Sequence, residues 1–209
     1  MSKGIIFDLD GTLWEVTNAV YENVNRFAKK YNLGEVDLET IKSIFGHNTL
    51  ECARICFPYL EEQRAVEIFV EANTELNNVL QEKGGTLYPN LEETLKELIN
   101  EYELFVVSNA SHSEYVEAFL NTSRLNSYFK DYIAASALNI TKAEGIQKII
   151  KDYNLKKAVY VGDTDLDLEA AKIVDIPFVH AKYGYMKNLE CDYHIQKIEQ
   201  LPKIVKEIF

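Results

Sequence analysis

The chain has 209 residues, of which 47% are hydrophobic and 26% charged, and its formal net charge is −11 at pH 7. This composition is typical of a globular protein and allows either one large domain or two small ones. The acidic excess argues against binding to nucleic acids or anionic membranes, because no basic stripe is available to neutralise phosphates. An anionic substrate would need a local metal or a few well-placed cations.

The first predicted element is a buried strand that ends in acidic residues, in the sequence IIFDLDGT at residues 5–12. Asp8 and Asp10 point the same way if the strand stays extended through residue 10, because side chains alternate along a strand. Two like charges about 4 Å apart repel by about 4 kcal/mol at an effective dielectric constant of about 20. The pair therefore requires a cation, a shared proton or solvent. On this string alone, a catalytic pair and a solvated turn at Gly11 fit equally well.

Residues 14–85 predict a group of helices that interrupts the strand pattern. Apolar residues recur at helical spacing from Val20 to Tyr31, from Leu38 to Ile44, before Pro58 and from Ala65 to Val79. We therefore expect a helical insert at residues 14–85, between two parts of a core domain at residues 1–13 and 86–209. The three cysteines show no metal-binding spacing, so Cys52 and Cys56 are expected to be small buried side chains.

From residue 86 onward the pattern alternates between helix and strand. Helical spacing or a capping-box sequence predicts helices at 91–99, from Ser111, from Thr141 and at 166–174. Short apolar runs predict strands at 104–107, 132–135, 158–161 and 177–180. The last begins with Pro177, which has no N–H to donate, so we expect it at the sheet edge. Short apolar strands separated by helices are typical of an α/β fold with a parallel sheet covered on both faces.

Polar residues follow three of the predicted strands. They are Asp8 and Asp10, then Ser108, then Asp163 with Asp167 four residues further on. Ligands of open parallel sheets bind at the carboxyl ends of the strands, and two strand ends that present carboxylates form an oxygen cluster suited to Mg²⁺. Acids at a helix N-terminus also complement the helix dipole, and this is the alternative explanation of the second acidic pair.

Lys142 is a second, independent sign of an anion-binding site. It directly follows Thr141, the proposed helix cap, and so falls in the first helical turn. A cation there opposes the helix dipole by about 0.3–1 kcal/mol. An exposed lysine tolerates this cost, but beside the carboxylates Lys142 fits better as the partner of an anion held at the helix start. Ser108 could donate to a phosphoryl oxygen, whereas Asn109 beside it is equally typical of a turn.

These motifs, in this order, resemble those of the haloacid dehalogenase superfamily of phosphohydrolases, in the branch with a helical cap after the first motif. The resemblance spans essentially the whole chain: DLDGT at 8–12, a strand ending at Ser108, Lys142, and GDTDLD at 162–167. The later segment AAKIVDIPFVHAKYGY is similar to that of phosphoglycolate-phosphatase-like members. The resemblance implies a Rossmann-like parallel sheet core, with residues 14–85 as the cap domain.

The resemblance also implies roles for the acidic residues. Asp8 would be the nucleophile that forms an aspartyl-phosphate, and Asp10 the general acid and base. Mg²⁺ would be held by Asp8, the backbone carbonyl of Asp10 and Asp163, with support from Asp167. An acid at position 10 favours phosphate-ester chemistry, since the dehalogenases of this superfamily lack it.

Around these acids, Ser108 and Lys142 are expected to complete an electrostatic cradle for the phosphoryl group. The residues expected to contact substrate are Gly11, Thr12, Asn109, His47 and Arg54. The segment containing His47 lies between two expected cap helices, where the family places a substrate-facing loop. A helix that ends at Gly46 and is followed by exposed polar residues explains the segment equally well.

The main functional expectation is a Mg²⁺-dependent phosphatase that acts on a small phosphorylated metabolite in the cytoplasm. A sugar phosphomutase of the β-phosphoglucomutase type uses the same core groups and is the alternative, and a non-catalytic phosphate-binding regulator is a third possibility. The chain departs from the family pattern at Pro89-Asn90-Leu91 and at Ala143, which weakens any transfer of substrate from well-known members. The sequence does not decide whether the protein is a monomer or a dimer.

Overall fold

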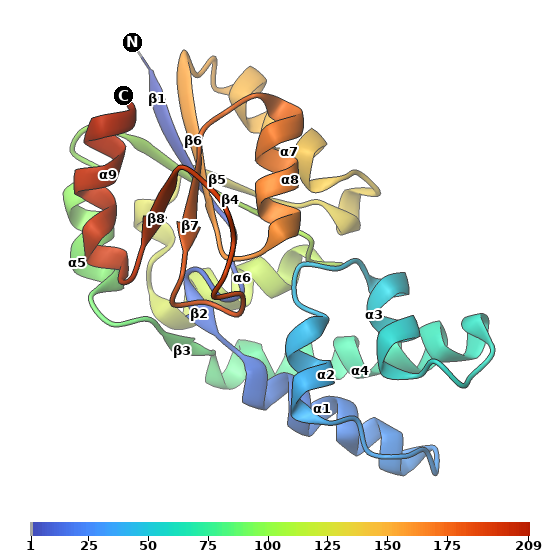
Figure 1. Cartoon of the computed structure of the whole chain (residues 1–209). Coiled ribbons are helices and arrows are strands. Elements are labelled where there is room, and N and C mark those ends of the chain that lie inside the picture. Colours follow the sequence, from blue (N-terminus) through green and yellow to red (C-terminus); the bar gives the residue numbers. More distant parts are fainter. Residues whose placement is uncertain (1) are drawn as a thin grey trace.

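The centre of the fold is a six-stranded sheet in which every neighbouring pair of strands is parallel (Figure 1). The computed structural model describes residues 2–209. The spatial order is β5-β4-β1-β6-β7-β8. The strands are β1 (Lys3–Phe7), β4 (Glu103–Ser108), β5 (Asp131–Ala134), β6 (Lys157–Gly162), β7 (Phe178–Ala181) and β8 (Tyr193–Ile195). The α/β fold with a parallel sheet core, predicted from the sequence, is confirmed.

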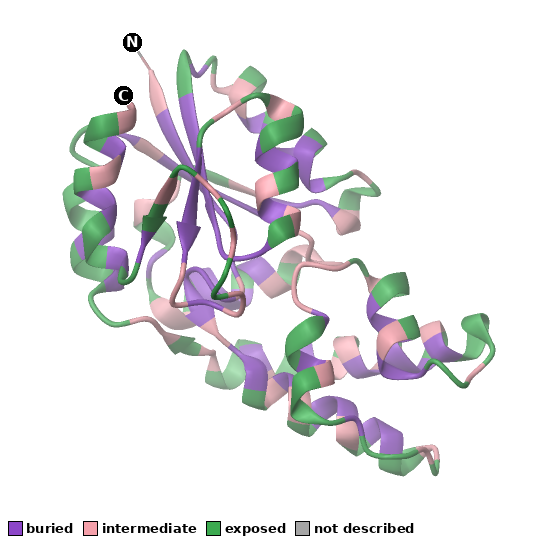
Figure 2. Ribbon diagram, in the orientation of Figure 1, coloured by how far each residue is buried: buried purple, intermediate pink, exposed green. Residues whose placement is uncertain are grey.

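Helices cover both faces of this sheet. One face carries α5 (Leu91–Leu98), α6 (Ser113–Ser123) and α9 (Leu201–Ile208), and the other carries α7 (Lys142–Asp152) and α8 (Asp165–Val174). Successive residues of β1 alternate between the two layers: Ile5 and Phe7 pack with the first group of helices and Ile6 with the second. Figure 2 shows the result, with the central strands largely buried and the helices buried on one side. Short 3₁₀ helices lie at Asn126–Tyr128, Ser136–Leu138 and Ile198–Gln200.

Four further helices form a second group beside the carboxyl ends of the strands (Figure 1). They are α1 (Thr17–Lys30), α2 (Leu38–Ser43), α3 (Thr49–Cys56) and α4 (Glu62–Lys83). The longest, α4, packs along α6 of the sheet layer. Cys52 and Cys56 are free and buried, as expected. Within the described residues, no helix combines the length and apolar character that a membrane crossing requires.

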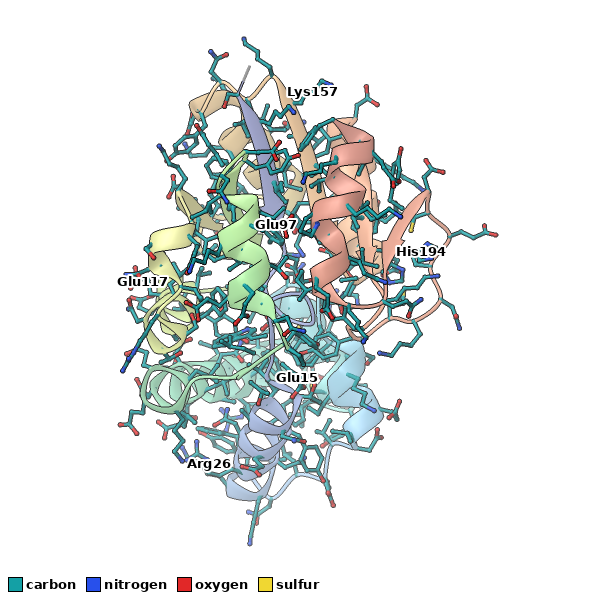
Figure 3. The ribbon with its side chains drawn as sticks, turned by 90° about the vertical axis from the view of Figure 1, so that its left-hand side faces the viewer. Glu15, Arg26, Glu97, Glu117, Lys157 and His194 are labelled. Carbon is teal, nitrogen blue, oxygen red and sulfur yellow. The ribbon has the colours of Figure 1, made fainter. Side chains whose placement is uncertain are left out.

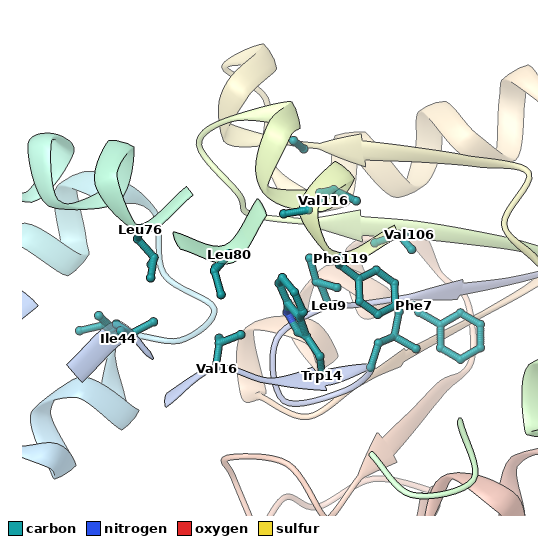
Figure 4. Packing of buried hydrophobic residues seen from close by; sticks show 14 of the residues in the cluster. Phe7, Leu9, Trp14, Val16, Ile44, Leu76, Leu80, Val106, Val116 and Phe119 are labelled. Atoms are coloured by element: carbon teal, nitrogen blue, oxygen red, sulfur yellow. The ribbon is translucent and has the colours of Figure 1, made fainter. Parts of the chain in front are cut away.

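Trp14 joins the interior of the four helices to that of the sheet layers. Its ring meets Phe119 of α6 edge-on at 5.3 Å, and Figure 4 shows Leu80 of α4 and Val16 on its other side. The same apolar cluster contains Phe7 of β1 and Leu76 of α4, so the two groups of elements share one core. Charged side chains such as Arg26, Glu97 and Glu117 lie on the outside (Figure 3).

The two chain segments that connect the helices to the sheet run side by side. β2 (Trp14–Glu15) and β3 (Thr86–Leu87) form an antiparallel pair in which Trp14 lies opposite Leu87 and Glu15 opposite Thr86. The expectation that residues 14–85 are entirely helical was therefore wrong at its first two residues. A strand of two residues is too short to show alternation in the sequence, so it is recognised only from its pairing with β3.

Two other local predictions also need correction. β7 was expected at the sheet edge, but it lies between β6 and β8. Pro177 precedes the strand, and its carbonyl accepts a hydrogen bond from the Tyr160 N–H at 3.0 Å, so its missing donor breaks no pairing. The capping box predicted at Ser111 does not form, because α6 begins two residues later and its cap makes no side-chain hydrogen bond. The capping box at Thr141 is confirmed.

Candidate active site

Asp8 leaves the carboxyl end of β1 and enters a tight turn. Its N–H still donates to the Val161 carbonyl of β6 at 2.8 Å, which fixes its position beside that strand. The N–H groups of Leu13 and Trp14 then both point back to the Leu9 carbonyl, at 2.9 and 3.3 Å. This turn buries the Asp8 side chain, which is only 4% exposed, at the edge of the sheet that faces the four helices.

Three buried carboxylates and one buried lysine meet at this edge. Asp8, Asp163 and Asp167 each offer a carboxylate oxygen, and the three oxygens lie within 4.8 Å of one another. Lys142 Nζ donates to Asp8 Oδ1 at 2.9 Å and to Asp167 Oδ1 at 2.5 Å. One positive charge therefore faces three negative charges. When all four groups are ionised, the excess of two negative charges matches a divalent cation.

The pKa values of these groups reflect that excess. The pKa of Asp8 is raised to about 7, because burial and then the charge of Asp167 raise it and Lys142 only partly opposes them. Burial and the same two carboxylates raise the pKa of Asp163 well above its usual range. Burial alone would lower the pKa of Lys142, but attraction to Asp167 and Asp8 outweighs it and the pKa is raised. The lysine thus stays charged while the carboxylates lack a full set of counter-charges.

The donor set fits a hard cation such as Mg²⁺, which binds oxygen ligands. Asp163 Oδ1 is buried and has no hydrogen-bond partner, while its Oδ2 accepts from the Tyr185 N–H at 2.6 Å. A buried carboxylate oxygen without a donor is costly unless a cation or water meets it. Asp167 is different, because its Oδ2 accepts from the N–H groups of residues 163 and 164 and from Thr164 Oγ1. Asp167 therefore holds both the loop at residues 163–164 and the Lys142 side chain in place.

Asp10 is held separately from this cluster by two side chains that the sequence analysis did not select. Asp10 Oδ1 accepts from Trp14 Nε1 and from Tyr115 OH, both at 2.8 Å. Desolvation raises the pKa of Asp10 to about 6, against the opposing effect of these hydrogen bonds. Its carboxyl can thus change protonation state near neutral pH. Tyr115 follows the apolar periodicity of its helix, so nothing in the local sequence indicated that its hydroxyl reaches the site.

A cavity of about 100 Å³ lies between these residues and the four helices. Among the predicted site residues, Asp8, Asp10, Ser108, Asn109, Lys142 and His47 line it. Ser108 ends β4 and is buried, whereas Asn109 Nδ2 reaches across and donates to the Gly46 carbonyl at 2.7 Å. His47 Nδ1 lies 3.2 Å from Glu51 Oε2. The structure therefore brings residues from the ends of β1 and β4 and one residue of the helical insert, His47, to one cavity.

Three residues expected to contact substrate do not line this cavity. Arg54 forms an exposed ion pair with Glu62 on the surface of the helical insert. Thr12 is fully buried, and its carbonyl accepts a hydrogen bond from Tyr183 OH at 2.9 Å. Gly11 has φ +79° and lies against Asp163, so it shapes the turn.

Two glycines enclose the Asp163 carboxylate from sequence positions far apart. A Cβ on Gly11 would lie 2.3 Å from Asp163 Oδ2, and one on Gly184 would lie 2.4 Å from the same oxygen. The N–H that follows Gly184, that of Tyr185, donates to Asp163 Oδ2. The Tyr185 ring also stacks on Phe45 of the helical insert at 4.0 Å.

We expect Gly11→Ala to destabilise the protein by about 1–3 kcal/mol, since alanine at this φ is strained and its Cβ would displace Asp163. Urea unfolding measures the loss, and the Mg²⁺ concentration for half-maximal activity should rise with it. Gly34→Ala is the matched control, because no atom lies within 4 Å of a Cβ at Gly34. Equal stability of the two variants would contradict the proposed packing around Asp163.

Comparison with known proteins identifies the family of this chain. Residues 5–181 match the family described as haloacid dehalogenase-like hydrolase, which covers most of the chain. The chain belongs to the haloacid dehalogenase-like hydrolase family. The resemblance inferred from the sequence motifs is thereby confirmed.

Curated relatives of this hydrolase are phosphatases. A phosphoglycolate phosphatase of Rhodobacter capsulatus is 25% identical over 215 residues, which cover 99% of this chain and 98% of the relative. A phosphoglycolate phosphatase of Aquifex aeolicus is 28% identical over 88% of this chain and 86% of its own. A haloacid dehalogenase-like family protein from Streptococcus pneumoniae has the same fold, with a TM-score of 0.86 at 20% identity and 98% coverage of both chains. The protein is thus a phosphatase of this family.

Proposed function

We propose that the protein hydrolyses a small phosphomonoester through an aspartyl-phosphate on Asp8, with Mg²⁺ as the cofactor. The observation that carries this proposal is the buried contact of Asp8 with Lys142 beside the partnerless oxygen of Asp163. Asp8 and Lys142 line the cavity, and oxygens of Asp8 and Asp163 lie within 4.8 Å of each other, which supports their proposed roles as nucleophile, fixed cation and metal ligand. Structural carboxylates buried for stability alone would each be fully hydrogen-bonded.

Two steps use the residues of the cavity. A carboxylate oxygen of Asp8 attacks phosphorus, the bond from phosphorus to the ester oxygen breaks, and Asp10 gives its proton to the departing alcohol. Water then attacks the same phosphorus, Asp10 takes up a proton from it, and the bond to Asp8 breaks to release inorganic phosphate. A pKa of about 6 suits Asp10 to both proton transfers.

Other residues hold the phosphoryl group and the cofactor. Lys142 and Ser108 compensate charge on the phosphoryl oxygens. Asp8, the Asp10 carbonyl and Asp163 would hold Mg²⁺, and Asp167 supports them by fixing Lys142 and the loop. Bound Mg²⁺ supplies positive charge that reduces the repulsion between an anionic nucleophile and an anionic substrate.

We also propose that residues 14–85 are a cap domain, in which His47 lies near the substrate and the short β2–β3 pair joins the cap to the core. The contact between Asn109 and the Gly46 carbonyl, together with the stacking of Phe45 on Tyr185, supports closure of the cap over the cavity. The proposed setting is the cytoplasm.

The test is hydrolysis of an aryl phosphate by the purified protein with Mg²⁺ and with excess chelator. We expect activity that is lost on chelation and restored by Mg²⁺, because without a cation the carboxylates repel the substrate. Activity that survives chelation would exclude the metal-dependent mechanism. Release of phosphate without isomerisation when a hexose bisphosphate is added separates a phosphatase from the phosphomutase alternative.

A further inference from the structure

Asp10 accepts two side-chain hydrogen bonds on the same carboxylate oxygen. Trp14 Nε1 and Tyr115 OH each donate to Asp10 Oδ1 at 2.8 Å. Among the described residues none donates to the other oxygen, Oδ2, and Oδ2 is not one of the fully buried atoms that lack a partner. Asp10 and Tyr115 both line the cavity beside Asp8. We propose that Tyr115, together with Trp14, is a positioning residue that holds the Asp10 carboxyl group so that Oδ2 carries the proton given to the leaving alcohol.

The chemistry of the two donors determines which oxygen of Asp10 can carry a proton. The indole N–H of Trp14 can only donate, so the oxygen that it contacts has to remain an acceptor. Two donors also occupy both lone pairs of Oδ1. The proton of the neutral carboxyl group therefore lies on Oδ2. When the ester bond breaks, its electron pair goes to the alcohol oxygen, which takes the proton from Oδ2, and Asp10 is left as a carboxylate.

Both donors are fixed by contacts away from the cavity. Trp14 is fully buried, and its ring meets those of Tyr115 and Phe119 edge-on at 5.7 and 5.3 Å (Figure 4 shows Trp14 beside Phe119). The Trp14 carbonyl also accepts from the Gly11 N–H at 2.9 Å, so Trp14 and Asp10 belong to one closed turn. Tyr115 comes from α6. Rotation of the Asp10 carboxyl group would break its bonds to two separate elements, and a reacting group held in this way loses little time in unproductive orientations.

The distribution of donors distinguishes Asp10 from a carboxylate with a structural role. Asp167 fixes its loop, and it accepts hydrogen bonds on both oxygens, from Lys142 on Oδ1 and from two N–H groups on Oδ2. At Asp10 both donors converge on one oxygen and leave the other available. The inference rests on the proposed role of Asp10 as general acid and base, and it adds the residues that orient this group.

Tyr115→Phe removes the hydroxyl group and keeps the ring. The test compares kcat/KM, with Mg²⁺, for phenyl phosphate and for 2,4-dinitrophenyl phosphate. The phenolate of the first is basic and needs a proton as it departs, whereas dinitrophenolate leaves without one. Because kcat/KM covers only the steps up to departure of the leaving group, hydrolysis of the aspartyl-phosphate does not enter. The ratio of the first value to the second should fall about five- to tenfold, the effect of one hydrogen bond.

Two further variants make the test specific. Asp10→Asn should lower the same ratio by more, and Tyr115→Phe added to it should lower the ratio no further, because the hydroxyl group then has no proton donor to orient. Tyr132→Phe is the matched control, since the Tyr132 hydroxyl also donates to a carboxylate, that of Glu117 of α6, but at an exposed position. It should not change the ratio. A ratio between two esters is independent of the fraction of folded protein.

The outcomes separate this inference from the proposed function. If Tyr115→Phe lowers both values of kcat/KM by the same factor, or lowers neither, the inference is overturned and the phosphatase proposal stands. A further fall of the ratio in the double variant shows that Tyr115 acts on the substrate directly, which also overturns the inference. An unchanged ratio in Asp10→Asn overturns the proposed role of Asp10 and the inference with it, as does a failure of the unaltered protein to hydrolyse either ester.

Discussion

Asp8→Asn is expected to lower kcat for aryl phosphate hydrolysis by roughly 10⁴-fold or more, as loss of a nucleophile does in other covalent enzymes. An amide cannot form the acyl phosphate, and the neighbouring acids do not replace it, since Asp167 is held by Lys142 and by its own loop. The fold should survive. The substitution removes one charge from a cluster that carries three negative charges and one positive charge when ionised.

The measurement is steady-state kcat with saturating Mg²⁺, together with thermal unfolding in the presence of chelator. We expect the unfolding temperature of the variant to equal or exceed that of the unaltered protein, because repulsion among the carboxylates decreases. Asp165→Asn is the control within the same acidic motif, since Asp165 is exposed and does not contribute to the cluster. Normal turnover by Asp8→Asn would refute a covalent role for this side chain.

Lys142→Met is expected to destabilise the protein by about 3–5 kcal/mol, the usual cost of removing one partner from a buried ion pair. Methionine occupies a similar volume but leaves Asp8 and Asp167 without their shared counter-charge. Activity should fall as well, because the phosphoryl group loses its fixed cation.

The loss of stability should depend on pH in a defined direction. The folded-state pKa of Asp8 is raised to about 7, so folding favours its protonated form, and stability falls as pH rises from about 4 to 7. Without Lys142 this pKa rises further, and the deficit should be larger at pH 8 than at pH 5. Urea unfolding with chelator at both pH values measures the difference.

Lys148→Met, on the exposed side of the same helix, is the control and should change stability by less than about 1 kcal/mol at either pH. A deficit independent of pH would show that Lys142 does not compensate these carboxylates.

The main elements of the site were predictable because their signals are local. An apolar run that ends in Asp8 predicts a strand end, and a capping box places Lys142 in the first helical turn. Parallel strands then bring such ends to one edge of the sheet, so Asp163 could be grouped with Asp8 before any coordinates. The same reasoning predicted the order of helix and strand between residues 91 and 180, but not β8 or α9 beyond them.

The unpredicted parts depend on contacts between distant segments. Tyr115 meets Asp10 across 105 positions of sequence, and the Tyr185 N–H reaches Asp163 from 22 positions away. Asn77 lies between apolar positions of α4, and periodicity does not reveal that the residue lines a cavity. The final strand, β8, has three residues, too few for a periodic signal. These features depend on tertiary packing, and no short stretch of the sequence predicts it.

Trp14 lies where the chain leaves the sheet for the helices, and it is the only tryptophan in the chain. It is fully buried and contacts Phe119 of the sheet layer within an apolar cluster that also includes α4. Neither group of elements can lose its structure without exposing this ring, so their unfolding is thermodynamically linked and forms one cooperative unit. The tryptophan fluorescence of the protein therefore reports on both groups at once, from a single residue that donates a hydrogen bond to the proposed proton donor Asp10.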